Sequence, residues 1–445
     1  MNPEKRPQLP ERAVIDSYLA SLTPIAVSGR PVIRPLIDET DDGPMPCSVK
    51  IYLIAFALSA TACSVGHPLV GVIPGTESGD SELSSLLLLT GLSAAAPSAT
   101  PTTSFHLKYA YVGQGNAGTV GMFAVDETTG ILTAQSPASI ASGGTSRYLA
   151  VHPAYTFLYA LNQGDATVSQ YSIDSSTGLL TALTPGTVAV SGASPFTIAI
   201  HPDGNYAYVG VSATGAIDMF LVDSASGQWT ANSPASLAGC TSPQNFVFHP
   251  TANFMYAVCA GSNRVQVYSI DTATGLLTHV SNSSGTGGQT KGLGITPDGS
   301  YLYIVSQAAT AVNMFSVNAV TGALTALAPA TIGADNWPNE IAIDAAGKYA
   351  YVNCWNSGAL TVRMYSIDSG TGQLANLSPQ SIATGGSSPL FVASEPSGKF
   401  IYVTNSSSDT VNMYAMDSTT GLLTSNGLQS TGAGPRGMVF AGTFE

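Results

Sequence analysis

The sequence predicts an all-β protein, a seven-bladed β-propeller with four antiparallel strands per blade, and three observations support this fold class. A unit with the core T/S-G-x-h-T (h, an apolar residue) recurs seven times, four short strand-like segments fill each repeat, and only 9% of the 445 residues are charged. An ordinary globular domain is about 25% charged, and exposed helix faces need Lys and Glu, so an all-α protein is excluded. With 44% hydrophobic residues the chain can bury a sizeable core, which excludes disorder.

The spacing of the repeat gives the number of blades. Its glycines are separated by 47 to 50 residues and lie at Gly130, Gly178, Gly227, Gly275, Gly322, Gly372 and Gly421. Runs such as residues 206–209 alternate apolar with small or polar residues, which is strand periodicity. Turn sequences such as HPDG at residues 201–204 separate these runs. Four short strands in a repeat of this length are typical of a propeller blade, and we label them A to D from the inside outward.

The two ends of the repeat region predict how the ring closes. The first repeat begins directly at a B strand, residues 108–113, and no A strand precedes it. An extra segment after the last repeat, residues 434–440, matches the A-strand pattern. We therefore expect the C-terminal strand to complete the first blade, which leaves no open sheet edge.

An export signal is predicted ahead of the repeats. Lys50 precedes eight apolar residues at 51–58, and Ser-Ala-Thr-Ala leads into Cys63. Spanning a bilayer needs about 20 apolar residues, so this run suits the core of an export signal instead. The small residues before Cys63 resemble a bacterial lipobox, with Ala60 in place of the usual Leu, and this implies cleavage before Cys63 and lipidation of its thiol. The alternative is an ordinary secretory signal cut near Ala62.

Four segments follow from these patterns. They are a doubtful N-terminal extension at residues 1–44, an export or lipoprotein-type signal at 45–63, a flexible Ser/Thr/Pro-rich tether at 64–103 and the propeller at 104–445. We expect an exported monomer, periplasmic or at the cell surface, that meets a membrane only through a lipid anchor. The net charge of -13 argues against a nucleic-acid partner, because such proteins carry basic patches.

The repeats resemble a known family. YVTN at residues 402–405, followed by DTV at 409–411 and Thr420-Gly421, is similar to the YVTN-type propeller repeat. The region 104–445 resembles the lactonase-family propellers related to 6-phosphogluconolactonase and muconate cyclase. The resemblance implies a seven-bladed propeller and, as an activity, lactone hydrolysis. Family members often place a His after the Pro that starts an A strand, and this sequence has none there. An exported protein would also not meet the cytosolic 6-phosphogluconolactone pool.

Residues that recur at one repeat position in several blades are interpreted as structural. His152, His201 and His249 occupy one repeat position, the turn between strands A and B, in three separate blades. Metal ligands must converge on one point, so we expect these histidines to serve the turns. A second column starts the C–D turn, where Asp accepts backbone N–H bonds: Asp126, Asp174, Asp223, Asp271, Asp368 and Asp417. Neither a metal nor a cofactor is expected, since no CxxCH or paired CxxC motif is present.

One column that differs between blades predicts an anion site. At the start of the A strands it reads Arg147, Phe196, Gln244, Lys291, Asn339, Leu390 and Arg436. Three of these seven residues are cationic, although residues 104–445 contain only eight Lys or Arg. Positive charge gathered within an acidic protein would attract a small anion, and two Arg can grip a carboxylate or phosphate. The alternative is that these are solvated rim residues.

Blade six differs from the others on the same face. Trp337 and Asn339 begin its A strand, Trp355 lies in its B–C loop, and carboxylates and amides flank both tryptophans. Aromatic planes with hydrogen-bonding neighbours suit sugar-like or ring-shaped ligands, although the pair could also simply cover the blade edge. Trp229 replaces a D-strand Leu and is interpreted as packing.

Two function classes remain open. The first is a propeller that binds a small anionic or sugar-like ligand, or an envelope protein, at its channel mouth, with Lys291, Trp337, Asn339, Trp355 and Gln244 as ligand-binding residues. A protein partner would need a broad apolar patch, for which the candidates are Phe196, Leu390 and Phe391. The alternative is a lactone hydrolase, with Glu340 as general base and Arg147 and Arg436 as a clamp for the oxyanion.

The propeller region contains one pair of cysteines that could be oxidised. Cys240 precedes the A strand of blade four, and Cys259 ends its B strand. The strand register is expected to hold the two several residues apart, which argues against a disulfide.

Overall fold

The computed structural model describes residues 25–27, 30–32, 105–283, 285–356 and 359–444. The chain divides into two compact units, residues 1–95 and 96–445. In the first unit β1 (Ile25–Val27) and β2 (Arg30–Val32) pair as antiparallel strands. The predicted signal, Cys63 and the tether at 64–103 lie outside the described residues. Within the ranges given above, no helix is both long and apolar enough to cross a bilayer.

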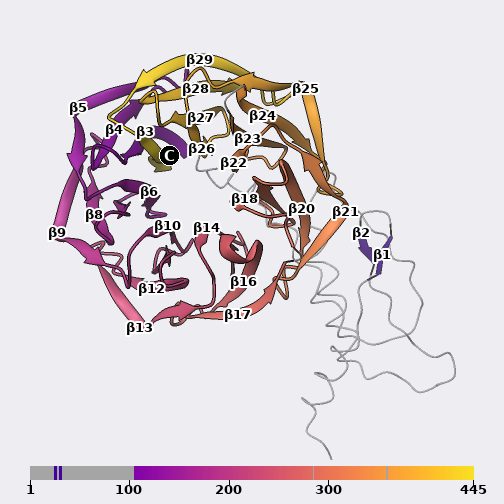
Figure 1. Cartoon of the computed structure of the whole chain (residues 1–445), viewed down its shortest axis with the longest axis horizontal. Coiled ribbons are helices and arrows are strands. Elements are labelled where there is room, and N and C mark those ends of the chain that lie inside the picture. The colour runs from indigo at the N-terminus through magenta and orange to yellow at the C-terminus, as the bar shows by residue number, and fades with distance from the viewer. Residues whose placement is uncertain (1–24, 28–29, 33–104, 284, 357–358, 445) are drawn as a thin grey trace, which may run out of the picture. The chain divides into compact units, whose positions relative to one another are not determined.

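The second unit is a seven-bladed propeller, as predicted, with four antiparallel strands in each blade (Figure 1). Blade one contains β30 (Pro435–Phe444), β3 (Phe105–Gln114), β4 (Thr119–Val125) and β5 (Leu132–Ala141). Blade two contains β6 (Ser146–Val151), β7 (Phe157–Asn162), β8 (Thr167–Ile173) and β9 (Leu180–Ala189). Blade three contains β10 (Pro195–Ile200), β11 (Tyr206–Val211), β12 (Ala216–Val222) and β13 (Trp229–Ala238).

The remaining blades repeat the same order from the centre outward. Blade four contains β14 (Pro243–Phe248), β15 (Phe254–Cys259), β16 (Arg264–Ile270) and β17 (Leu277–Asn282), with a 3-10 turn at Ala260–Ser262. Blade five contains β18 (Thr290–Ile295), β19 (Tyr301–Ser306), β20 (Ala311–Val317) and β21 (Leu324–Gly333). Blade six contains β22 (Pro338–Ile343), β23 (Tyr349–Asn356), β24 (Ala359–Ile367) and β25 (Leu374–Ala383). Blade seven contains β26 (Pro389–Ser394), β27 (Phe400–Asn405), β28 (Thr410–Met416) and β29 (Leu423–Ser430).

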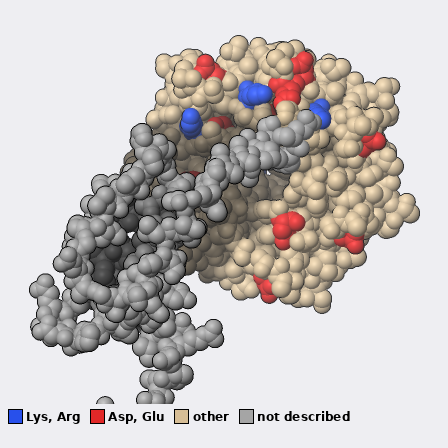
Figure 2. Space-filling model, turned by 180° about the vertical axis from the view of Figure 1, so that it is seen from behind, with Lys and Arg blue, Asp and Glu red and all other residues tan. Residues whose placement is uncertain are grey.

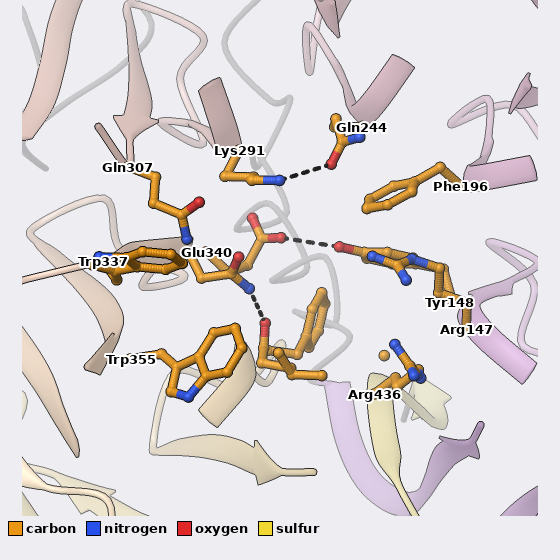
Figure 3. A pocket seen from close by; sticks show the side chains of 14 residues that line it. Arg147, Tyr148, Phe196, Gln244, Lys291, Gln307, Trp337, Glu340, Trp355 and Arg436 are labelled. Carbon is orange, nitrogen blue, oxygen red and sulfur yellow. Dashed lines mark hydrogen bonds between the residues drawn. The ribbon is translucent and has the colours of Figure 1, made fainter. Parts of the chain in front are cut away.

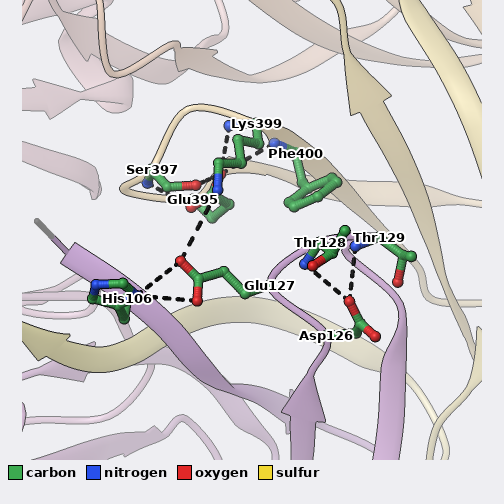
Figure 4. A network of polar contacts seen from close by, with 9 residues as sticks. All are labelled: His106, Asp126, Glu127, Thr128, Thr129, Glu395, Ser397, Lys399 and Phe400. Carbon is green, nitrogen blue, oxygen red and sulfur yellow. Dashed lines mark hydrogen bonds and ion pairs between the residues drawn. The ribbon is translucent and has the colours of Figure 1, made fainter.

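The C-terminal strand closes the ring, as the repeat pattern predicts. β30 pairs antiparallel with β3 from Phe105–Phe444 to Gln114–Pro435 and becomes the innermost strand of blade one. Glu127 adds polar contacts at the seam, because its carboxylate lies 3.1 Å from His106 Nδ1 and 4.0 Å from Lys399 Nζ of blade seven (Figure 4). Closure therefore joins the two ends of the propeller in one sheet and leaves no inner edge exposed.

The repeat glycine holds neighbouring blades together. In blade two Gly178 has φ +70°, and a Cβ on it would lie 2.2 Å from the Tyr109 ring of blade one, so only glycine fits. Its carbonyl accepts a 2.7 Å hydrogen bond from the buried Tyr111 hydroxyl. The same Tyr-to-Gly bond recurs at five further seams, including Tyr402 to Gly130, which joins blade seven to blade one. These bonds explain why both residues recur along the chain.

The recurring Asp and His residues serve turns, as predicted. Asp126 Oδ1 accepts the backbone N–H groups of Thr128 and Thr129 (Figure 4), and the other five members of the Asp column do the same. His249 Nδ1 accepts the N–H groups of Thr251 and Ala252 within its own turn.

Acidic side chains are scattered over the face of the molecule that Figure 2 shows, where Lys and Arg side chains are few.

The predicted separation of Cys240 and Cys259 is wrong, because the two form a disulfide with their Cα atoms 5.0 Å apart. The register argument assumed that the chain runs straight into β14. Instead Gly239 and Ser242 have φ angles of 119° and 53°, which bend the approach. Cys240 is thereby turned back over the end of β15, where its Sγ lies 3.9 Å from the Val258 carbonyl oxygen.

Candidate functional site

Each A strand carries an irregularity that determines what faces the channel. In all seven pairings of an A strand with its B strand, the A strand has a bulge of one extra residue near its first residue, as between Pro338 and Glu340. Successive side chains of a regular strand point to opposite faces, whereas a bulge re-aims them. Consecutive residues such as Asn339 and Glu340, or Arg147 and Tyr148, consequently line the same cavity.

This cavity has a volume of about 290 Å³ and lies at the start of the A strands (Figure 3). All seven members of the variable column line it, and so do Trp337, Glu340 and Trp355, which the sequence also singled out. The complete lining comprises Arg147, Tyr148, Phe196, Gln244, Lys291, Gln307, Trp337, Asn339, Glu340, Trp355, Leu390, Phe391, Arg436 and Gly437. The ring of blades has thus brought together residues that are almost 300 positions apart in the sequence.

Glu340 is buried in the cavity wall, with 4% of its surface exposed. Asn245 Nδ2 donates a 2.8 Å hydrogen bond to its Oε1, and the Tyr148 hydroxyl lies 3.5 Å from its Oε2. Burial penalises the charged form and raises the pKa of Glu340 to about 8, although its hydrogen bonds partly oppose the shift. Gly292 makes room for this side chain, because a Cβ there would lie 2.7 Å from Glu340 Oε1.

Three cations surround the cavity without carboxylate partners. Within the described residues, no ion pair joins Arg147, Lys291 or Arg436 to an acid. The Arg147 guanidinium stacks 3.5 Å from the centre of the Phe196 ring and donates to Gln163, while Lys291 Nζ lies 3.4 Å from Gln244 Oε1.

Burial and the repulsion between neighbouring cations lower the pKa values of Arg147 and Lys291. Burial, with the nearby Arg436, lowers the pKa of Arg147 to about 10, and burial followed by the charge of Arg147 lowers the pKa of Lys291. Arg147 nevertheless stays charged at neutral pH, as its pKa lies well above 7. An anion bound among these groups would replace their lost hydration and reduce their repulsion.

The tryptophans form a different side of the cavity. The Trp337 and Trp355 rings meet edge to face, with centroids 6.1 Å apart, and their side chains remain 50% and 38% exposed. Phe196, Leu390 and Phe391 all line the cavity, so the three candidates for a flat protein-binding patch face inward. Trp229 packs in the core against Tyr159 and Phe220, as predicted.

Sequence reasoning missed Tyr148, Asn245 and Gln307. Tyr148 and Asn245 occupy the position immediately after the variable column, where Glu340 also lies. That position varies between blades as the first column does, which is the signal that could have identified them. Gln307 follows β19 and enters the cavity from a loop, so no strand column contains it. In the part of the chain that the structure describes, no cluster of three His, Cys, Asp or Glu could hold a metal ion.

Fold and site together define a seven-bladed propeller with a cavity at the start of its central strands that three cationic side chains line. The model of the family "Lactonase, 7-bladed beta-propeller" matches residues 106–291 and 293–440, and the chain belongs to this family. The resemblance noted from the sequence is thereby confirmed. The search of functionally curated proteins found no significant match.

Solved structures share the fold. A candidate 6-phosphogluconolactonase from Bacteroides fragilis is 21% identical, with 78% of this chain and 100% of that chain covered and a TM-score of 0.65. The periplasmic gluconolactonase of Pseudomonas aeruginosa is 19% identical, with 75% and 99% covered and a TM-score of 0.63. At these identities the likeness shows the fold alone.

Proposed function

We propose that the protein is a lactonase that hydrolyses a small anionic lactone in the cavity at the start of the A strands. One observation carries the proposal: a buried carboxyl with a raised pKa, Glu340, lies in the same cavity as three cations that pair with no described acid. Membership of the lactonase family supports the choice of reaction.

Glu340 acts as the general base in this proposal. Its ionised carboxylate takes a proton from water as the water oxygen bonds to the lactone carbonyl carbon. Arg147 and Arg436 stabilise the negative charge that develops on the carbonyl oxygen. The ring C–O bond then breaks, the proton on Glu340 passes to the leaving oxygen, and a hydroxy acid is released. Asn245 positions the carboxyl group through its hydrogen bond to Oε1.

Lactone hydrolysis by the full chain and by Glu340→Gln tests this reaction in a pH-stat, with a panel of sugar and aliphatic lactones and subtraction of spontaneous hydrolysis. We expect kcat/KM to rise as the pH passes through about 8, since the base must be ionised, and to fall at least 100-fold in the variant. Glu127→Gln, which changes a carboxylate at the blade-closure seam, is the matched control. Turnover that survives in Glu340→Gln would remove Glu340 from the mechanism. The absence of turnover with every lactone would favour a binding propeller.

We also propose that the protein is exported and anchored through a lipid on Cys63. The apolar run at 51–58 and the small residues before Cys63 support this, as does the fold shared with a periplasmic gluconolactonase. The substrate would then be an extracytoplasmic lactone and not the cytosolic 6-phosphogluconolactone. Metabolic labelling with a radioactive fatty acid in a bacterial host should mark the wild type and not Cys63→Ser. Equal labelling of both proteins would contradict the assignment.

A further inference from the structure

The cavity has an aromatic side and a cationic side. In Figure 3, Trp337 and Trp355 lie on one side, Arg147 and Arg436 lie on the opposite side, and Glu340 lies between them. Leu390 and Phe391 add apolar surface to the lining. A ligand that uses both sides must carry a negative charge at one end and a group that stacks on tryptophan at the other.

The backbone conformation of Trp337 is unfavourable for a bulky side chain. It has φ +56°, in the left-handed region, which a bulky residue rarely adopts. The equivalent positions of the other blades have the same backbone but are occupied by Thr145, Ser194, Ser242, Gln289, Ser388 and Gly434. Its ring is 50% exposed, so packing gives little in return for the strain. Because all seven blades share this backbone, the conformation belongs to the fold. What distinguishes Trp337 is a large, half-exposed ring in the cavity lining, which indicates that the ring is there to contact a ligand.

Two of the polar groups near the tryptophans are already occupied by the protein. Asn339 Nδ2 donates a 2.5 Å hydrogen bond to the Leu390 carbonyl oxygen. Asp335, which the sequence placed beside Trp337, instead forms an ion pair with Arg363 and accepts a bond from Thr361. A sugar ring stacked here would find the Gln307 amide but would leave several other hydroxyl groups without partners, and each of these would lose its bonds to water. An apolar ring has no such requirement.

We infer that the ligand is an anionic lactone carrying a flat apolar ring, with the lactone carbonyl oxygen, which becomes part of the product carboxylate, between Arg147 and Arg436 and the ring against Trp337 and Trp355. The lactone part of this inference rests on the proposed function, whereas the division into an anion end and a ring end rests on the cavity alone. The cavity's volume of about 290 Å³ accommodates one such small molecule.

Binding of two carboxylates to the full chain, measured by isothermal titration calorimetry, tests the division. The probes are 3-phenylpropanoate, which has an apolar ring, and gluconate, which has the same charge and several hydroxyl groups. We expect 3-phenylpropanoate to bind at least tenfold more tightly. Trp355→Ala and Trp337→Ser should each weaken it three- to tenfold and leave the affinity for gluconate within twofold.

Trp337→Ser introduces the residue that three other blades carry at this position, so this variant should fold with an unchanged or higher Tm. Gln289→Ser, at the equivalent position of blade five and outside the cavity lining, is the control and should bind both probes as the wild type does. Tighter binding of gluconate, or equal losses for both probes, would overturn the inference.

The experiments distinguish a failure of the proposed lactonase activity from a failure of the proposed ring subsite. Selective binding of 3-phenylpropanoate without turnover of any lactone would refute the lactonase and retain the ring subsite. Turnover of plain sugar lactones together with weak binding of 3-phenylpropanoate would do the reverse.

Discussion

Replacing Glu340 with Gln should make the protein more stable relative to the wild type as the pH rises. Gln keeps the shape of the side chain and an oxygen that can accept the bond from Asn245, but it cannot ionise. In the wild type, folding raises the pKa of Glu340 from 4.5 to about 8. A carboxyl with a raised pKa favours the folded state below pH 4.5, and this contribution is lost as the pH rises through 8.

The size of the effect follows from that shift. A shift from 4.5 to about 8 is 3.5 pKa units, and at 1.36 kcal/mol per unit the full effect is about 5 kcal/mol. Between pH 5 and pH 9 the wild type should lose about 4 kcal/mol relative to Glu340→Gln, because part of the titration lies outside this window. For a domain of this size the loss corresponds to a relative fall in Tm of about 6 °C.

Thermal unfolding of both proteins, followed by circular dichroism at pH 5, 7 and 9, measures the difference. Every other titrating group is common to the two proteins, so the change in their Tm difference with pH isolates Glu340. A Tm difference that is constant over this range would refute the reasoning, since it would mean that Glu340 ionises near its ordinary pKa.

Two further predictions concern residues outside the reaction itself. Gly292→Ala should lower both kcat/KM, at least tenfold, and Tm, because its Cβ would press on the backbone of β22 at Glu340 as well as on the Glu340 carboxyl; an unchanged kcat/KM would contradict this. Reducing the Cys240–Cys259 disulfide, which closes a loop of 19 residues, should cost about 3 kcal/mol of stability. Denaturant unfolding with and without dithiothreitol measures that cost, and Cys259→Ala, which lacks the bond in both conditions, should not respond to the reductant.

The amino-acid sequence was sufficient for the architecture. A propeller repeats one supersecondary unit, so glycines at Gly130 and its equivalents count the blades, and the unmatched segments at the two ends predict the closure by β30. The same alignment of repeats separates structure from function. Positions at which most blades carry the same residue, such as Asp126, cap turns. The column that includes Arg147, in which the residue differs between blades, lines the cavity. These inferences succeed because each strand contacts neighbours whose identity the repeat already specifies.

Only the tertiary structure decided how the site is assembled. β-Bulges direct adjacent residues such as Asn339 and Glu340 into one cavity. The alternation of apolar and polar residues in the sequence does not reveal where these bulges lie. The bend at Ser242 that closes the disulfide is likewise a backbone feature. The pKa of Glu340 and the separation of cations from tryptophans depend on burial and on distances between blades, and these are set by the curvature of the closed ring and not by spacing along the chain.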